Sequence, residues 1–150
     1  MTTSGQICRR EAVYATRETT LQDTAKLMRH HHVGTIVVID STNGKRTPIG
    51  MVTDRDIVMV ANAVDLDPNV ITVGDIMALE LVTVREYEGL LETAEIMRYK
   101  RVRQLPVVDR EDQLVGIIAM DDLLEALAEQ MTEMVQIMSE GHRRETQLRQ

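Results

Sequence analysis

The chain has 150 residues with no Trp or Phe, a mean hydropathy of -0.17 and a formal net charge of -7. An acidic surface repels a phosphate polymer, which argues against nucleic acid as a partner. No apolar run approaches the roughly 18 residues that span a bilayer, and the N-terminus lacks the apolar core of a secretory signal. With a single cysteine, an intramolecular disulfide is excluded. We therefore expect a cytoplasmic protein without a membrane partner.

An internal repeat organises the sequence. Residues 5–7 (Gly-Gln-Ile) match residues 74–76 (Gly-Asp-Ile) at an offset of 69, and residues 28–29 match residues 97–98 at the same offset. Beyond a central hairpin the offset falls to 66, and loops tolerate a length difference of this size. Self-similarity of this kind indicates two structural units that stack to bury one apolar core.

The first repeat is predicted to contain five elements in a β-α-β-β-α order. They are a strand around Val13, a helix from about Thr20, two β-branched runs at residues 35–39 and 49–52, and a helix from Thr53. Asn43-Gly44 between the two runs is a strong hairpin signal. We place this repeat at residues 1–64 and a linker at residues 65–73.

The second repeat, at residues 74–128, follows the same order. Its predicted elements are a strand around Val82, a helix from about Gly89, strands at residues 105–108 and 114–118, and a helix from about Met120. The predicted fold class is thus α+β, with two repeats packed around a pseudo-two-fold axis. Clefts between such units are common places for small ligands.

The C-terminal segment predicts a helix longer than the repeat requires. Apolar side chains advance by steps of four and three residues, which gives a heptad seam of Met120, Leu124, Leu127, Met131, Met134 and Met138. This helical extension occupies residues 129–150; we expect the helix to end at Gly141 and the polar residues after it to fray. The seam either lies on its own domain or pairs with a second helix in a homodimer.

The whole pattern resembles a pair of cystathionine-β-synthase (CBS) domains, and in particular small stand-alone bacterial proteins of that family. The resemblance rests on the repeated unit, on residues 50–57 (Gly-Met-Val-Thr-Asp-Arg-Asp-Ile) and on residues 102–109 (Val-Arg-Gln-Leu-Pro-Val-Val-Asp). It implies a non-catalytic regulatory module that requires no cofactor. It also implies an adenosine-containing effector such as AMP, ADP, ATP, S-adenosylmethionine or NADH, and an unidentified regulated protein.

The resemblance implies roles for particular residues. Thr53 would contact a phosphate and Asp56 the ribose hydroxyls, with Val52 beside them. In the second repeat Asp122 is kept, but Ala119 stands where the family has Ser or Thr. In that half-site Arg103 would be the basic residue before the strand that neutralises phosphate, with Gln104 next to it, whereas the first repeat has Gly34-Thr35 there. We therefore expect one competent half-site, or two that bind different ligands, with the first as the better candidate.

Other interpretations remain open at this stage. Thr53 and Asp56 also form the pattern of a helix capping box, which needs no ligand. The chain could instead be a ligand-free interaction adaptor that works through the Met-rich C-terminal helix. The His30-His31-His32 run suggests a metal-responsive protein less well, because consecutive helical residues point in different directions. We predict no metal site, and no motif of a known catalytic type is present.

Overall fold

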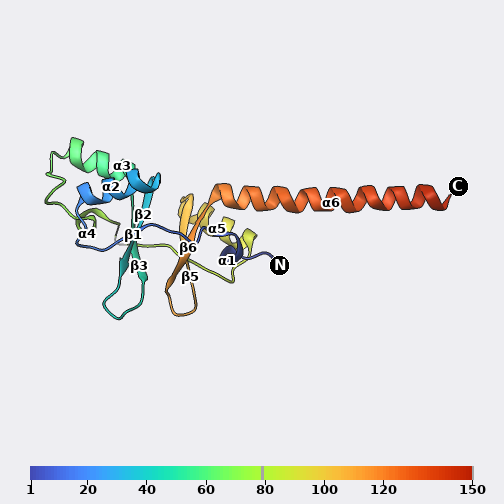
Figure 1. Cartoon of the computed structure of the whole chain (residues 1–150), viewed down its shortest axis with the longest axis horizontal. Coiled ribbons are helices and arrows are strands. Elements are labelled where there is room, and N and C mark those ends of the chain that lie inside the picture. The colour runs from blue at the N-terminus through green and yellow to red at the C-terminus, as the bar shows by residue number, and fades with distance from the viewer. Residues whose placement is uncertain (79, 150) are drawn as a thin grey trace.

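The computed structural model describes residues 1–78 and 80–149, and it contains two similar α+β units followed by a long helix (Figure 1). The predicted fold class is confirmed. Each unit is built on a three-stranded sheet whose first two strands are parallel and whose last two are antiparallel.

The first unit contains β1 (Tyr14–Ala15), α2 (Leu21–His31), β2 (Thr35–Asp40), β3 (Thr47–Thr53) and α3 (Asp54–Val58). A short π-helix, η1 (Met59–Ala63), continues α3. Thr20 begins α2 as predicted, because its side chain accepts a hydrogen bond from the Asp23 amide (3.1 Å). The antiparallel β2–β3 pair is the predicted hairpin.

The second unit repeats this order with β4 (Val84–Arg85), α5 (Leu90–Lys100), β5 (Gln104–Val108), β6 (Leu114–Ala119) and α6 (Met120–Leu148). Helix α6 passes through Gly141 and ends at Leu148. The predicted helix end at Gly141 and the frayed tail are therefore wrong. A helical glycine costs only about 1 kcal/mol relative to alanine, which is too little to stop a helix in progress.

Two short helices, α1 (Ser4–Ile7) and α4 (Val73–Ile76), were not predicted from the sequence, and each docks on the unit that it does not precede. The Gly5 amide donates to the carbonyl of Glu86 (2.8 Å), and the Gly74 amide donates to that of Arg17 (3.0 Å). These four residues are equivalent pairs at the offset of 69. The two units are therefore joined by a reciprocal exchange of their leading segments.

Each unit has its own aliphatic core, and the exchange extends into it. Cys8 packs with Met97 and Ile118 of the second unit, while Val73 packs with Leu21 and other residues of the first. Cys8 is therefore a small core residue, and burial raises the pKa of its thiol above the usual 9.0. The exact boundaries given to the two repeats, residues 1–64 and 74–128, stay a prediction.

Candidate functional site

A hollow of about 210 Å³ lies between the two units. It is lined by residues 9 and 11–13, by residues 32–35, and by Gln104 and Ile117 from the second sheet. Thr35 and Gln104 begin equivalent strands, β2 and β5. The hollow therefore lies where the leading edges of the two sheets approach each other.

The end of α2 shapes one wall of this hollow. His32 follows the helix with a left-handed backbone (φ 54°), and its amide donates to the Met28 carbonyl. This turn ends the helix and directs residues 33–35 into β2. Arg101 takes the same conformation (φ 57°) after α5 in the second unit. The left-handed residue recurs because both repeats connect this helix to the next strand by a loop of the same short length.

The start of α3 lies against the same wall. The Thr53 amide donates to Asp56 Oδ2 (2.9 Å), and the Asp56 amide donates to Thr53 Oγ1 (3.2 Å). This is a complete capping box, the interpretation that the sequence left open beside ligand binding. The Asp54 amide also donates to the carbonyl of Gly34 (3.0 Å), which lines the hollow. Thr53 and Asp56 thus adjoin the hollow without lining it.

The second half-site is arranged differently. Asp122 Oδ2 accepts a hydrogen bond from the Ala119 amide (2.7 Å), and Asp122 Oδ1 lies 3.4 Å from Nη2 of Arg9. The Asp122 side chain is only 11% exposed. Both of its oxygens are engaged by the protein, whereas Asp56 is exposed. The two half-sites are unlike, although their site residues remain a prediction.

The remaining predicted residues occupy three environments. Val52 is fully buried in the core of the first unit. Arg103 is exposed, and its carbonyl accepts a hydrogen bond from the Met120 amide (2.8 Å). Gln104 is the one predicted residue that lines the hollow, and its buried Oε1 has no hydrogen-bond partner among the described residues. A buried acceptor without a donor is unusual in a folded protein.

Several lining residues were missed by sequence reasoning. They come from the segment before the first strand and from the turn after α2: Arg9, Glu11, Ala12, Val13, His32, Val33, Gly34 and Thr35. The repeat alignment could have indicated Thr35, since it is the counterpart of Gln104. Nothing in the sequence indicates Arg9, because its position depends on the exchange of leading segments. Its amide and carbonyl both bond to Ile117 in β6 (2.9 and 3.0 Å).

The three histidines at the end of α2 have different surroundings. The rings of His30 and His31 meet edge to face with centroids 4.8 Å apart, and His32 borders the hollow. Within residues 1–78 and 80–149, no three His, Cys, Asp or Glu side chains come together as possible ligands for a metal ion.

The sequence model of the family described as CBS domain matches residues 5–62 and again residues 73–129. The chain belongs to the CBS domain family. The two matches correspond to the two units of the structure, so the tandem CBS pair inferred from the internal repeat is confirmed. No helix in the described part of the chain is both long enough and apolar enough to cross a membrane.

Curated relatives of this CBS pair come from several lineages. CBS domain-containing protein YhcV of Bacillus subtilis is 38% identical over 104 residues, covering 69% of this chain and 70% of YhcV. Hypoxic response protein 1 of Mycobacterium tuberculosis is 32% identical and covers 86% of this chain and 87% of its own. Uncharacterized protein MK0525 of Methanopyrus kandleri is 33% identical over 81% of this chain, which spans only 60% of MK0525.

Solved structures of CBS proteins match the fold. Hypoxic Response Protein I with two coordinated zinc ions has a TM-score of 0.73 and 30% identity, covering 83% of this chain and 98% of its own. CBSX2 in complex with AMP has a TM-score of 0.72 and 25% identity, covering 86% and 98%. The hexameric CBS-CP12 protein from bloom-forming cyanobacteria has a TM-score of 0.71 and 28% identity, covering 83% and 70%. CBS pairs related to this chain therefore include nucleotide-bound and oligomeric proteins.

Proposed function

We propose that this chain is a non-catalytic regulatory module that binds an adenosine-containing ligand between its two CBS units. The observation that carries the proposal is Gln104, which lines the hollow and whose buried Oε1 lacks a donor. The amino group of adenine is a donor of the kind that this oxygen needs, and rotation of the Gln104 side chain would turn the buried oxygen toward the hollow. Such a bond is favourable because an unpaired buried acceptor costs about 1–3 kcal/mol.

The size of the hollow limits how the ligand is held. Its volume of about 210 Å³ is below the roughly 300–1,000 Å³ of sites that enclose a whole drug-sized ligand. The base would occupy the hollow, and the ribose and phosphate would extend to the exposed start of α3. There Asp56 Oδ1, the oxygen that the capping box does not use, would accept hydrogen bonds from the ribose hydroxyls, and Thr53 would contact the phosphate.

The first half-site is the proposed place of binding. In the second, Arg9 engages Asp122, and Ala119 offers no hydroxyl. A ligand there would have to displace Arg9 and leave a carboxylate with little exposure unpaired, which is costly. CBSX2, which is 25% identical, is described as a complex with AMP. This supports an adenine nucleotide as the class of ligand, acting as a regulatory effector on a separate protein.

We also propose that the protein is a cytoplasmic homodimer. A ligand-free adaptor is the second candidate function, favoured by the exposed apolar side chains of α6, which include Met131, Met134 and Met138. The two functions are separable by experiment. An adaptor has a stability that ignores every nucleotide, whereas a ligand-binding module is stabilised by at least one of them.

The test is thermal unfolding of the protein with AMP, ADP, ATP, S-adenosylmethionine and NADH. A ligand at 100 times its dissociation constant adds about 2.7 kcal/mol to the folded state. For a chain of this size the midpoint then rises by roughly 5–10 °C. The proposal expects this rise for at least one ligand. No rise with any of the five would contradict it.

A matched control separates binding from capping. Asp56→Ala removes both the proposed ribose contact and one half of a capping box. Asp75→Ala removes half of an equivalent box, in which the Thr72 amide donates to Asp75 Oδ2 (3.0 Å), without touching the hollow. Both variants should lose about 1 kcal/mol of stability. Only Asp56→Ala should also lose the ligand-induced rise relative to its own ligand-free midpoint.

A further inference from the structure

The second half of α6 stands away from the rest of the chain. Figure 1 shows the helix continuing well beyond both sheets as a straight arm, and every residue from 128 to 149 is exposed. Helices in proteins depend mainly on packing for stability, and this stretch includes Gly141 and β-branched residues that lower helix propensity. The arm, residues 128–148, therefore lacks the support that its sequence requires within the described part of its own chain.

The arm carries a continuous apolar face. The predicted heptad seam divides in the structure. Met120 and Leu127 pack on the second unit, whereas Leu124 and the seam residues after Leu127 are exposed. Val135 and Ile137 widen this face on either side. Its exposed apolar side chains, each between 58% and 80% accessible, are Leu124, Met131, Met134, Val135, Ile137, Met138 and Leu148. A face of this kind predicts a helical partner.

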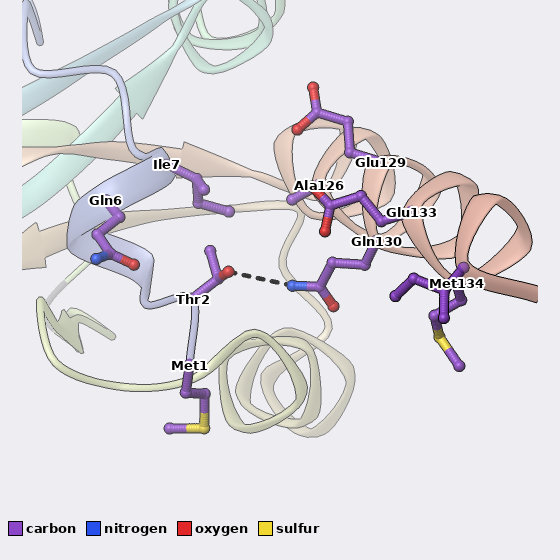
Figure 2. Close-up of a pocket in the computed structure, with 10 residues that line it drawn as sticks. Met1, Thr2, Gln6, Ile7, Ala126, Glu129, Gln130, Glu133 and Met134 are labelled. Atoms are coloured by element: carbon purple, nitrogen blue, oxygen red, sulfur yellow. Dashed lines mark hydrogen bonds between the residues drawn. The ribbon is translucent and has the colours of Figure 1, made fainter. Parts of the chain in front are cut away.

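A groove of about 700 Å³ runs between the base of the arm and the N-terminal segment. Figure 2 shows Ile7, Ala126 and Met134 along it, with the carboxylates of Glu129 and Glu133 on the α6 side. Nε2 of the Gln130 side chain donates to the Thr2 hydroxyl (3.1 Å), which connects the two walls of the groove. The groove is thus partly apolar and bordered by negative charge, which suits an amphipathic helix that carries basic residues.

The charge of α6 changes along its length. Its first half carries only acidic charges: Asp121, Asp122, Glu125, Glu129 and Glu133. Its last turns contain Arg143 and Arg144, with Arg149 directly after the helix, against Glu140 and Glu145. Two parallel copies would place like charges side by side, which is destabilising. Two antiparallel copies would place the basic end of each helix along the acidic half of the other.

We propose that α6 pairs with α6 of a second copy of this chain in the antiparallel orientation. The heptad seam supports one register, in which Met134 lies opposite the partner's Met138, Met131 opposite the partner's Gly141, and Leu124 opposite the partner's Leu148. Antiparallel pairs place an a position against a d position at every layer, and all three pairs obey that rule. The proposal deepens the homodimer proposed above and is independent of ligand binding.

The same register places opposite charges beside the seam. Asp121 of one helix lies across from Arg149 of the partner, because both occupy e positions, which face each other in an antiparallel pair. One layer is less favourable, because Leu127 meets the partner's Glu145 near the edge of the pair. The two CBS pairs of the dimer then lie at opposite ends of a two-helix rod.

Spin labels on a Leu148→Cys variant test the orientation in the full chain. Residues 124 and 148 are 24 positions apart, so the antiparallel register separates the two labels of a dimer by about 36 Å. A parallel pair brings them to about 10 Å. The native Cys8 should react slowly with the label, because it is buried and its pKa is raised. Labelling of the unsubstituted chain measures how much label Cys8 takes up.

Each outcome is decisive when read with the mass of the unsubstituted chain from analytical ultracentrifugation. A dimer with labels about 36 Å apart supports the proposal. A dimer with labels about 10 Å apart, or with any distance that excludes the register, overturns the antiparallel inference and leaves the homodimer standing. A monomer at micromolar concentration overturns both. Nucleotide binding, measured separately, is not affected by any of these results.

Charge exchange supplies a second test that does not depend on a label. Asp121→Arg should weaken the dimer by about tenfold at low salt, because attraction to the partner's Arg149 becomes repulsion in both copies of the contact. Adding Arg149→Asp to the same chain should restore it. These residues are too far apart along one helix to contact each other, so restoration requires a second chain. Failure to restore the dimer overturns the antiparallel register.

Discussion

Replacing Gln104 by methionine should make the ligand-free protein more stable. The side chain lines the hollow between the units, and its buried Oε1 has no donor among the described residues. Leaving an acceptor unpaired costs about 1–3 kcal/mol, whereas an apolar side chain of the same length pays no such cost. We expect a gain of about 1–2 kcal/mol, which corresponds to a midpoint about 3–6 °C higher for 150 residues.

Urea unfolding is the assay for this prediction. The transition of Gln104→Met should move to higher urea with an unchanged slope, since the surface exposed on unfolding is the same. The control is Gln113→Met, which changes a half-buried glutamine in the β5–β6 turn and should shift the free energy of unfolding by less than about 0.5 kcal/mol. A Gln104→Met variant less stable than the parent would show that the amide has a partner and would refute the reasoning.

Three further predictions concern the fold. Gly5→Val should lower the free energy of unfolding by about 1–3 kcal/mol, because a Cβ at Gly5 would lie 2.8 Å from the Glu86 carbonyl oxygen; chemical denaturation measures this. Gly141→Ala should increase the helical circular dichroism signal, since a Cβ there meets nothing within 4 Å. Above about pH 9 stability should fall, because folding raises the pKa of Cys8 and so favours its protonated form. Cys8→Ala should lose that part of the alkaline decline; an identical pH profile would contradict the assignment.

The repeat in the sequence was sufficient to predict the order of elements in both units. Equivalent residues repeat the same local signals, such as Thr20 before α2, so each element is indicated twice. The exchange of leading segments could not be predicted, because it depends on contacts such as Gly5 with Glu86 that join residues far apart in sequence. The end of α6 was misplaced because Gly141 has only a weak effect inside a long helix.

The candidate site could be predicted from the sequence only in part. The Thr53–Asp56 pattern was visible in the sequence, but so was its alternative use as a capping box, and the structure contains that box. Capping uses Oδ2 of Asp56, and the proposed ribose contact would use the other oxygen, so the pattern alone cannot separate the two roles. Gln104 was selected by resemblance, while its unpaired oxygen is a property of packing. Arg9 was missed because the exchange brings it to Asp122.

Equilibrium dialysis with radiolabelled AMP, ATP and S-adenosylmethionine tests the central claim most directly, because it counts bound molecules. The account predicts saturation of at least one of them at one molecule per chain, with loss of binding in Asp56→Ala and retention in Asp75→Ala. Equal binding by the parent chain and Asp56→Ala, or no saturable binding of these three and of ADP and NADH, would contradict a ligand site at the first half of the cleft.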